Sequence, residues 1–182
     1  MKKETKRPLS KKKQLKEDFL SALENAFGDV LTEYKFPWLV LKGISEMDVP
    51  EQKIYNALVS MRGFKDFYRI GTSLRCDYVL PRQKIIVEFD ERQHFTLQRA
   101  KSFEFYPDDT TVFFDKKIWS ERCYNLKAYD NDPPYRDEQR AFFDSLRDIR
   151  SFKNGFKLIR FYEKDLTSSE EIEKSVQKIK EL

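Results

Sequence analysis

The sequence predicts an α/β protein in which helices flank a mixed β-sheet, with a helical extension at the N-terminus. Two observations carry this prediction. Apolar residues recur at helical spacing near both ends of the chain, and strand-like segments cluster in its middle, with one more strand before the last helix. The resulting order of helix, three strands, helices, strand and helix implies a mixed sheet covered by helices.

Composition excludes several classes of protein. The 182 residues are 40% hydrophobic and 36% charged, which fits one folded domain and excludes a disordered or low-complexity chain. The chain contains no apolar run near the roughly 20 residues that span a bilayer, and its Lys-rich start lacks the apolar core of a secretory signal. Its two cysteines, Cys76 and Cys123, form no C-x-x-C pair, which argues against a disulfide framework or a zinc ribbon. We therefore expect a soluble, cytoplasmic protein.

The net charge of +4 is unevenly distributed. Residues 1–20 contain eight Lys or Arg against three acidic residues, a net of +5, and the remaining 27 basic and 28 acidic residues give −1. We expect residues 1–11 to form a flexible basic arm, and Lys11, Lys12 and Lys13 to attract nucleic-acid phosphates. The net basicity is therefore no argument that the body of the protein binds nucleic acid.

Two segments are expected after this arm. Residues 12–47 form an N-terminal helix and a connecting segment, and residues 48–182 form the main domain, with an insertion at about 95–134. In the first segment, an apolar stripe at helical spacing begins near Lys12 and ends before Gly28. Residues 36–41 fit either a strand or a buried loop, because Pro37 weakens the strand interpretation.

The main domain begins with a predicted helix from Val49 to Gly63, where Asp48 and Glu51 have the spacing of a capping box. Strands are predicted at 67–70, 74–80 and 83–90, and the last two are close enough to form a hairpin. The remaining predicted elements are short helices at 97–105 and 116–128, a helix at 135–149, a strand at 156–162, and a final helix that starts at a Ser168–Glu171 capping box.

Three acidic residues are expected to meet on the predicted hairpin. Glu88 and Asp90 are two residues apart on one strand and so share a face, and the adjacent strand brings Asp77 near them. Clustered carboxylates repel one another unless a cation is present, and Mg²⁺ prefers such oxygen ligands. A metal there can activate water and neutralise charge on a phosphate. His94, just beyond the strand, can act as a general base or steady the phosphate.

Simpler interpretations exist for these residues. Glu88 and Asp90 fit a solvated outer face, although the apolar Ile86 on the same face argues against it. Glu51 fits the third position of a helix cap on local grounds alone. His94, the single histidine, fits a structural imidazole.

Other polar and aromatic residues also leave alternatives open. Asp137 and Arg140 fit a surface pair at i, i+3. Arg160, a charge in the middle of a strand, is expected to meet a carboxylate or the substrate. The aromatic residues of the insertion extend the core, contact DNA or form an oligomer surface, and core packing is the commonest of these roles. They are Phe105, Tyr106, Phe113, Phe114 and Trp119.

Five segments, in this order, resemble the very-short-patch-repair-like and EDxHD branch of the PD-(D/E)xK nuclease superfamily. They are Pro50–Tyr55, Cys76–Val79, Ile86–Asp90 followed by Gln93-His94, Arg136–Arg140, and Gly155–Phe161. The resemblance covers roughly residues 49–166 and leaves the insertion without a counterpart. It implies a restriction-endonuclease-like core in a bacterial or phage-encoded intracellular protein.

The resemblance also implies Mg²⁺-dependent hydrolysis of phosphodiester bonds in DNA, expected to be double-stranded, by an endonuclease or nickase, with Mn²⁺ as a substitute. It makes Asp77, Glu88 and Asp90 the expected metal ligands. Beyond these, the expected catalytic residues are Glu51, His94 and Asp137, and the expected nucleic-acid contacts are Lys11, Lys12, Lys13, Arg92, Arg140 and Arg160.

Two positions depart from the family pattern. Asp90 stands where the standard motif has a lysine, so His94 or Arg92 would have to orient the attacking water. Glu91 stands where many relatives have glycine, and it adds negative charge. These departures keep two alternatives open, a catalytically inactive nucleic-acid-binding module with a nuclease fold, and a structural or partner-binding protein. The sequence leaves open restriction or phage defence, repair or homing, and a monomer or a homodimer.

Overall fold

The computed structural model describes residues 11–182, and for Lys11 and Lys12 it describes the backbone alone. All but the last position of the expected basic arm therefore lies outside the described residues. The strands are β1 (Leu31–Tyr34), β2 (Cys76–Leu80), β3 (Ile85–Asp90) and β4 (Lys157–Tyr162). The helices are α1 (Lys11–Phe27), α2 (Val49–Arg62), α3 (Leu97–Phe103), α4 (Lys116–Leu126), α5 (Arg136–Lys153) and α6 (Ser169–Lys180).

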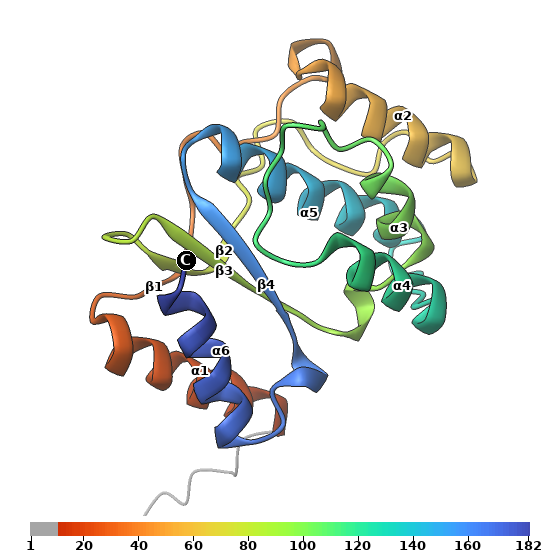
Figure 1. The fold of residues 1–182 in the computed structure, drawn as a ribbon. Helices are drawn as coiled ribbons and strands as arrows, with labels where there is room; N and C mark the ends of the chain where they lie inside the picture. The colour runs from red at the N-terminus through yellow and green to blue at the C-terminus, as the bar shows by residue number, and fades with distance from the viewer. Residues whose placement is uncertain (1–10) are drawn as a thin grey trace, which may run out of the picture.

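The described strands form one mixed sheet in the order β1-β2-β3-β4. β2 pairs with β1 and with β3 in antiparallel orientation, and β4 pairs with β3 in parallel after the chain has crossed over through α5. Helices lie on both sides of this sheet (Figure 1). The predicted α/β class, a mixed sheet flanked by helices, is therefore confirmed.

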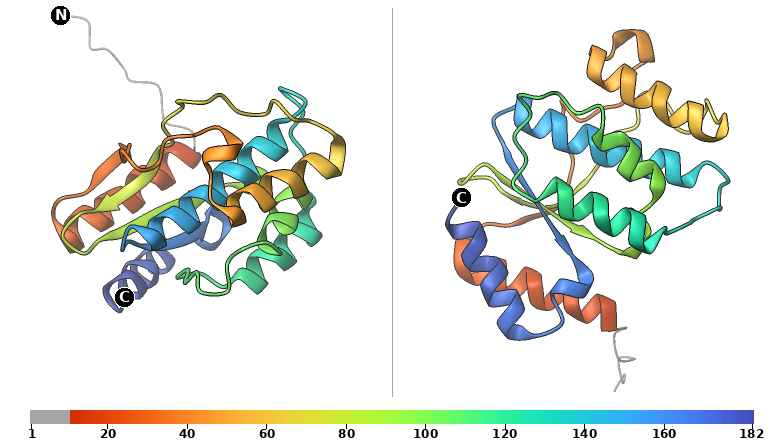
Figure 2. Two further views of the ribbon diagram at one scale, coloured as in Figure 1. Left: turned by 90° about the horizontal axis from the view of Figure 1, so that it is seen from above. Right: turned by 45° about the vertical axis from the view of Figure 1, so that its right-hand side comes forward.

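One face of the sheet is covered by α1 and α6, which lie side by side (Figure 2). Phe19 and Leu23 of α1 are fully buried there. The Phe19 ring packs edge-on against Tyr78 and Phe161, with 5.8 and 5.6 Å between ring centroids. The apolar stripe predicted for the N-terminal helix is confirmed, and it fixes α1 on the sheet.

The opposite face packs against α5, and α2 and α3 pack on α5 in turn. Phe142 and Leu146 of α5 are fully buried and share a core with Ile86 of β3. All six residues of β3 are buried, because helices cover both of its faces. The interpretation of Glu88 and Asp90 as solvated residues on an outer face is therefore wrong.

The predicted and observed strands differ in two places. Residues 67–70 form no strand, and Phe67 is instead fully buried in a loop, with its ring centroid 5.6 Å from that of Phe142. β1 was not predicted, since its side chains are exposed and follow no apolar alternation. Residues 36–41 form a buried loop with a single β-bridge at Val40.

The capping box predicted at Asp48 and Glu51 is wrong. Asp48 precedes α2, but its side chain makes no cap hydrogen bond and pairs with Lys153 instead. Glu51 accepts two hydrogen bonds from Arg150 of α5, each at 2.9 Å. Long-range ion pairs thus replace the local cap, whereas the capping box predicted at Ser168–Glu171 is present.

The insertion at 95–134 contributes α3 and α4, which pack beside α5 and each other. Tyr106 and Trp119 are buried in two of the cores, as expected for core packing. Cys76 and Cys123 are buried free thiols. None of the helices in residues 11–182 is both long and apolar enough to cross a membrane.

Replacing Phe19 by alanine should lower the free energy of unfolding by about 3–5 kcal/mol, because it empties the contact between α1 and the sheet. Urea denaturation followed by circular dichroism measures this loss. Tyr124→Ala, at a side chain that is 52% exposed, is the aromatic control and should cost less than about 1 kcal/mol. Equal losses for the two variants would contradict the assigned core.

Candidate nuclease site

Asp77 interrupts the regular alternation of β2. Cys76 packs in the core under α5, whereas Tyr78, two positions later, packs in the core under α1. The Oδ2 atom of Asp77 accepts a hydrogen bond from the Phe89 N–H at 2.8 Å. The ladder between β2 and β3 ends at the pair of Tyr78 and Val87, so this side-chain bond lies just beyond it. The half-buried carboxylate is thereby left between the two cores, beside the end of β3.

Glu88 of β3 is the second carboxylate at this place. Its side chain is buried, and its Oε1 atom has no hydrogen-bond partner among the described residues. Its Oε2 atom lies 3.7 Å from Nε of Arg147. Burial raises the pKa of Glu88 to about 8 despite the charge of Arg147, and the neighbouring Asp77 adds to the rise. Burial also raises the pKa of Asp77. The positive charges around this pair therefore do not fully compensate it.

Asp90 has the opposite surroundings. Its Oδ1 atom accepts a hydrogen bond from Nη1 of Arg160, and its Oδ2 atom accepts one from Nε1 of Trp119, both at 2.7 Å. Arg160 is only 2% exposed and also lies 2.9 Å from Oδ1 of Asp148. The mid-strand arginine has thus met carboxylates, one of the two outcomes expected from the sequence. Both oxygens of Asp90 already have donors.

His94 lies in a 3₁₀ turn directly after β3. Its Nδ1 atom is 2.9 Å from Oδ2 of Asp144 on α5 and 3.4 Å from Oδ1 of Asp90. Burial acts to raise the pKa of Asp144, but the charges of His94 and Arg160 hold it well below its ordinary value. Asp144 is therefore an ionised, buried partner for the imidazole.

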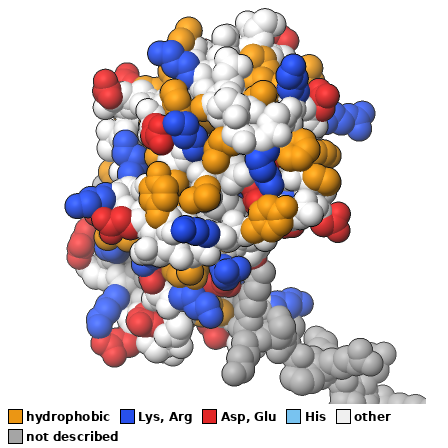
Figure 3. All heavy atoms as spheres, turned by 90° about the vertical axis from the view of Figure 1, so that its right-hand side faces the viewer, with side chains coloured by type: hydrophobic (Ala, Val, Ile, Leu, Met, Phe, Trp, Pro, Cys, Tyr) orange, Lys and Arg blue, Asp and Glu red, His pale blue; other side chains and the backbone are white. Residues whose placement is uncertain are grey.

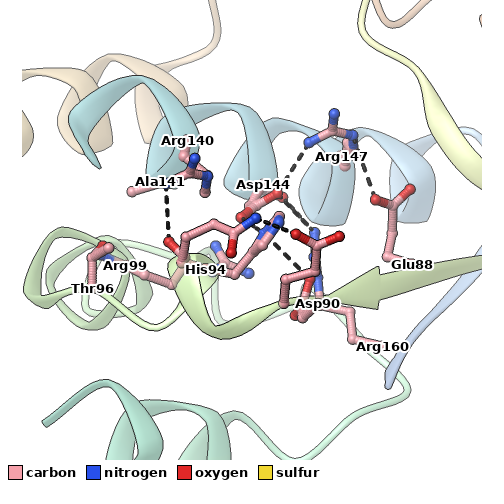
Figure 4. A network of polar contacts seen from close by, with 12 residues as sticks. Glu88, Asp90, His94, Thr96, Arg99, Arg140, Ala141, Asp144, Arg147 and Arg160 are labelled. Atoms are coloured by element: carbon pink, nitrogen blue, oxygen red, sulfur yellow. Dashed lines mark hydrogen bonds and ion pairs between the residues drawn. The ribbon is translucent and has the colours of Figure 1, made fainter. Parts of the chain in front are cut away.

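Arg147 links the two parts of the site. Its Nη1 atom donates to Oδ1 of Asp144 at 3.0 Å, and its Nε atom donates to the Arg75 carbonyl at 2.7 Å and lies 3.7 Å from Oε2 of Glu88. Figure 4 shows this side chain reaching from α5 between the two carboxylates, with Asp90, His94 and Arg160 on the β3 side. One guanidinium thus holds the carboxylate that orients His94 and the carboxylate that is left under-neutralised.

More buried charges lie behind these residues. Asp148 accepts hydrogen bonds from Arg99 at 2.5 Å and from the Tyr106 hydroxyl at 2.6 Å. Arg99 also donates to Ser145 at 3.0 Å. Because a buried charge is costly without a partner, this network constrains how α3, α5 and β4 pack together.

Two predicted catalytic residues lie apart from this group. Glu51 is buried in its ion pair with Arg150. Asp137 lies in the first turn of α5, seven residues before Asp144, which is about 10 Å along the helix axis. Its Oδ2 atom is 3.5 Å from Arg62. Asp144, rather than Asp137, is the α5 aspartate that contacts His94.

The predicted nucleic-acid contacts differ in their exposure. Arg92 and Lys13 are exposed, whereas Arg140 is largely buried. Arg140 lies 4.0 Å from Asp137, its expected i, i+3 partner, but the Asp137 side chain is buried, so the prediction of a surface pair is wrong. Arg160 is enclosed by carboxylates, which leaves it no surface for a nucleic acid in this conformation. On the face seen in Figure 3, Lys and Arg side chains are scattered among hydrophobic and acidic ones.

A metal ion fits part of the predicted ligand set. Within residues 11–182, no group of three or more His, Cys, Asp or Glu side chains is arranged to hold one. Mg²⁺ often binds through one or two carboxylates and takes its other ligands from water and substrate phosphate. Asp77 and Glu88 fit this pattern, since a cation would satisfy the unpartnered Oε1 atom of Glu88. Asp90 does not fit as a third ligand, because Arg160 and Trp119 occupy both of its oxygens.

Sequence reasoning missed Asp144 and Arg147, which sit on the polar stripe of α5. Such a stripe is typical of a solvated face, but here it is buried against other elements. The apolar stripe of α5 packs in the same core as Ile86 and the apolar residues of α2. One signal was available, the small residues Ala141 and Ser145 among the acids of that stripe. Small residues permit close packing, and both are buried.

The raised pKa of Glu88 predicts how stability varies with pH. Between about pH 4.5 and pH 8 the folded protein holds a proton on Glu88 that the unfolded chain releases, so the free energy of unfolding falls as pH rises through this window. Glu88→Gln should remove this loss, and its stability relative to the parent should rise by about 3–5 kcal/mol from pH 4 to pH 9. Urea denaturation in EDTA measures it. Glu104→Gln, at an exposed residue, is the control, and parallel curves for E88Q and the parent would contradict the prediction.

No family model, no curated protein and no solved structure matches the chain. Any assignment of function therefore depends on the residues of the site.

Proposed function

We propose that this chain is a metal-dependent DNA endonuclease or nickase that hydrolyses phosphodiester bonds, in restriction or phage defence, repair or homing. One observation carries the proposal. Two under-neutralised carboxylates, Asp77 and Glu88, are neighbours, and the charge of His94 acts on Asp77. A buried aspartate, Asp144, holds His94 by Nδ1. A cation site beside a general base provides the groups that hydrolysis of a phosphate ester needs.

The arrangement of the strands supports the proposal. Three antiparallel strands, a crossover helix and a parallel fourth strand agree with the restriction-endonuclease-like core that the resemblance implies. Asp77 lies near the start of β2, Glu88 near the end of β3, and His94 in the turn that follows. The carboxyl ends of parallel strands are a frequent location for ligand sites in sheets of this kind.

Asp77 and Glu88 are the residues that would hold the divalent cation, Mg²⁺ or Mn²⁺. When bound, the cation supplies positive charge that activates water and neutralises the phosphate. Glu88 offers its buried Oε1 atom, and Asp77 offers Oδ1, since Oδ2 accepts the Phe89 N–H. The other oxygen of Glu88, Oε2, lies 3.7 Å from Nε of Arg147.

His94 would take a proton from the attacking water or steady the phosphate. A carboxylate at Nδ1 favours the tautomer with its proton on that atom, so Nε2 is the nitrogen left to accept a proton. Asp144, instead of the expected Asp137, would therefore be the α5 aspartate that positions His94. Asp90 and Arg160 would hold the end of β3 against α5 and take no direct part.

A second function is favoured by a different observation. Asp90 is occupied by Arg160 and Trp119, so the described site offers two cation ligands instead of the three expected. A catalytically inactive nucleic-acid-binding module would have such a site. In that case DNA binding would be independent of divalent cations, because no cation would be needed at the carboxylates.

Incubation with supercoiled plasmid tests the proposal. Nicked or linear DNA should form with Mg²⁺ or Mn²⁺ and fail to form in EDTA, and Asp77→Asn and Glu88→Gln should each slow cleavage at least about 10²-fold. The thermal midpoint of each variant checks folding. If the folded parent protein binds DNA equally well with and without cations and cuts neither DNA nor RNA, the binding-module alternative replaces the nuclease.

The two aspartates of α5 should differ in their effect on cleavage. Asp144→Asn should lower kcat about 10²-fold or more, because the amide no longer holds His94 by an ionic hydrogen bond. Asp137→Asn should lower kcat less than tenfold, since its carboxylate contacts Arg62 and Arg140 instead. Single-turnover cleavage at saturating DNA measures both rates. A larger loss in D137N than in D144N would refute the assignment of Asp144 to His94.

A further inference from the structure

The N-terminal helix brings one particular lysine to the carboxylate pair. Lys16 lies one turn before Phe19, whose ring packs against Tyr78 and Phe161. The backbone carbonyl of Lys16 accepts a hydrogen bond from the Tyr78 hydroxyl at 3.3 Å. Tyr78 directly follows Asp77 on β2. The backbone of Lys16 is therefore fixed in position relative to Asp77 by packing and by a hydrogen bond.

The side chain of Lys16 lies at a pocket that opens beside Asp77. Its Nζ atom is 3.3 Å from Oε1 of Glu91 and 5.0 Å from the ring centroid of Phe89. Lys16 and Asp77 line the same pocket between α1 and the paired strands β1 and β2, with a volume of about 250 Å³. Among the charges that act on the Asp77 carboxylate, that of Lys16 has the largest effect, and it lowers the pKa of Asp77.

Lys16 differs from the arginines around the site. Arg147 and Arg160 are enclosed by buried carboxylates of β3 and α5, so their charges are already paired inside the protein. The Lys16 side chain is 34% exposed, and its contact is with Glu91, whose side chain is 11% exposed. Lys16 therefore borders solvent, and an ammonium group on a flexible stem can turn toward an incoming anion.

We propose that Lys16 binds the substrate phosphate at the Asp77–Glu88 pair. The inference rests on the proposed nuclease function and extends it to a residue of the N-terminal helix. A phosphate that approaches Asp77 and Glu91 is repelled by their charges, and the ammonium group of Lys16, which contacts Glu91 and lines the pocket beside Asp77, offsets this repulsion. Because negative charge grows on the phosphate oxygens in the transition state, Lys16 contributes mainly to kcat.

Cation binding and cleavage should respond to Lys16→Gln in opposite directions. Removing a positive charge beside Asp77 should tighten Mn²⁺ binding about fivefold, as measured by titration calorimetry without DNA. The same substitution should lower kcat about 10²-fold at saturating DNA and Mn²⁺, and Lys16→Arg should recover at least tenfold of that loss. A merely structural role would weaken both properties or neither.

Lys174→Gln is the matched control, because Lys174 is an exposed helical lysine that pairs with Glu170. Glutamine is about as favourable as lysine in a helix, so the thermal midpoints of both variants should equal that of the parent. If the parent protein cuts DNA and K16Q changes Mn²⁺ affinity and kcat no more than K174Q does, the role of Lys16 is refuted and the nuclease stands. If the parent protein binds Mn²⁺ and cuts no nucleic acid, the nuclease is refuted, and the phosphate role of Lys16 with it.

Discussion

The rest of the structure depends on the ion pairs of the buried Arg160 guanidinium. It joins three elements, since it stands on β4, pairs with Asp90 of β3 and pairs with Asp148 of α5. A buried charge is strongly destabilising if a partner is lost, so these ion pairs tolerate little relative movement of the sheet and the helix. With α5 held in this register, Asp144 reaches His94 and Arg147 reaches Glu88.

The same network separates the acidic residues into two groups. Asp90, Asp144 and Asp148 each have cationic partners inside the protein. Asp77 and Glu88 lack full compensation, and burial raises the pKa of both. A dense acidic cluster in a sequence therefore says little about which acids are open to a ligand. Whether a carboxylate is paired with a cationic residue decides whether it is open to a ligand.

Local sequence patterns were sufficient to predict most of the fold. The alternation of β3 and the apolar stripe of α5 are each written in consecutive residues, and both were confirmed. The failures came from distant partners. Glu51 resembles a helix cap but pairs with Arg150, which lies 99 residues further along the chain. Asp144 resembles a surface residue because His94, the residue it contacts, lies 50 residues earlier in the chain.

The position of Asp77 between two cores has a consequence for how this chain can diverge. Its neighbours Cys76 and Tyr78 each fill one hydrophobic core, whereas Asp77 itself belongs to neither. Exchanging that one side chain alters the chemistry of the opening without emptying a core. Descendants of this sequence can therefore lose the Asp77 carboxylate and still keep their fold. A shared fold among them would be no guarantee of a shared activity.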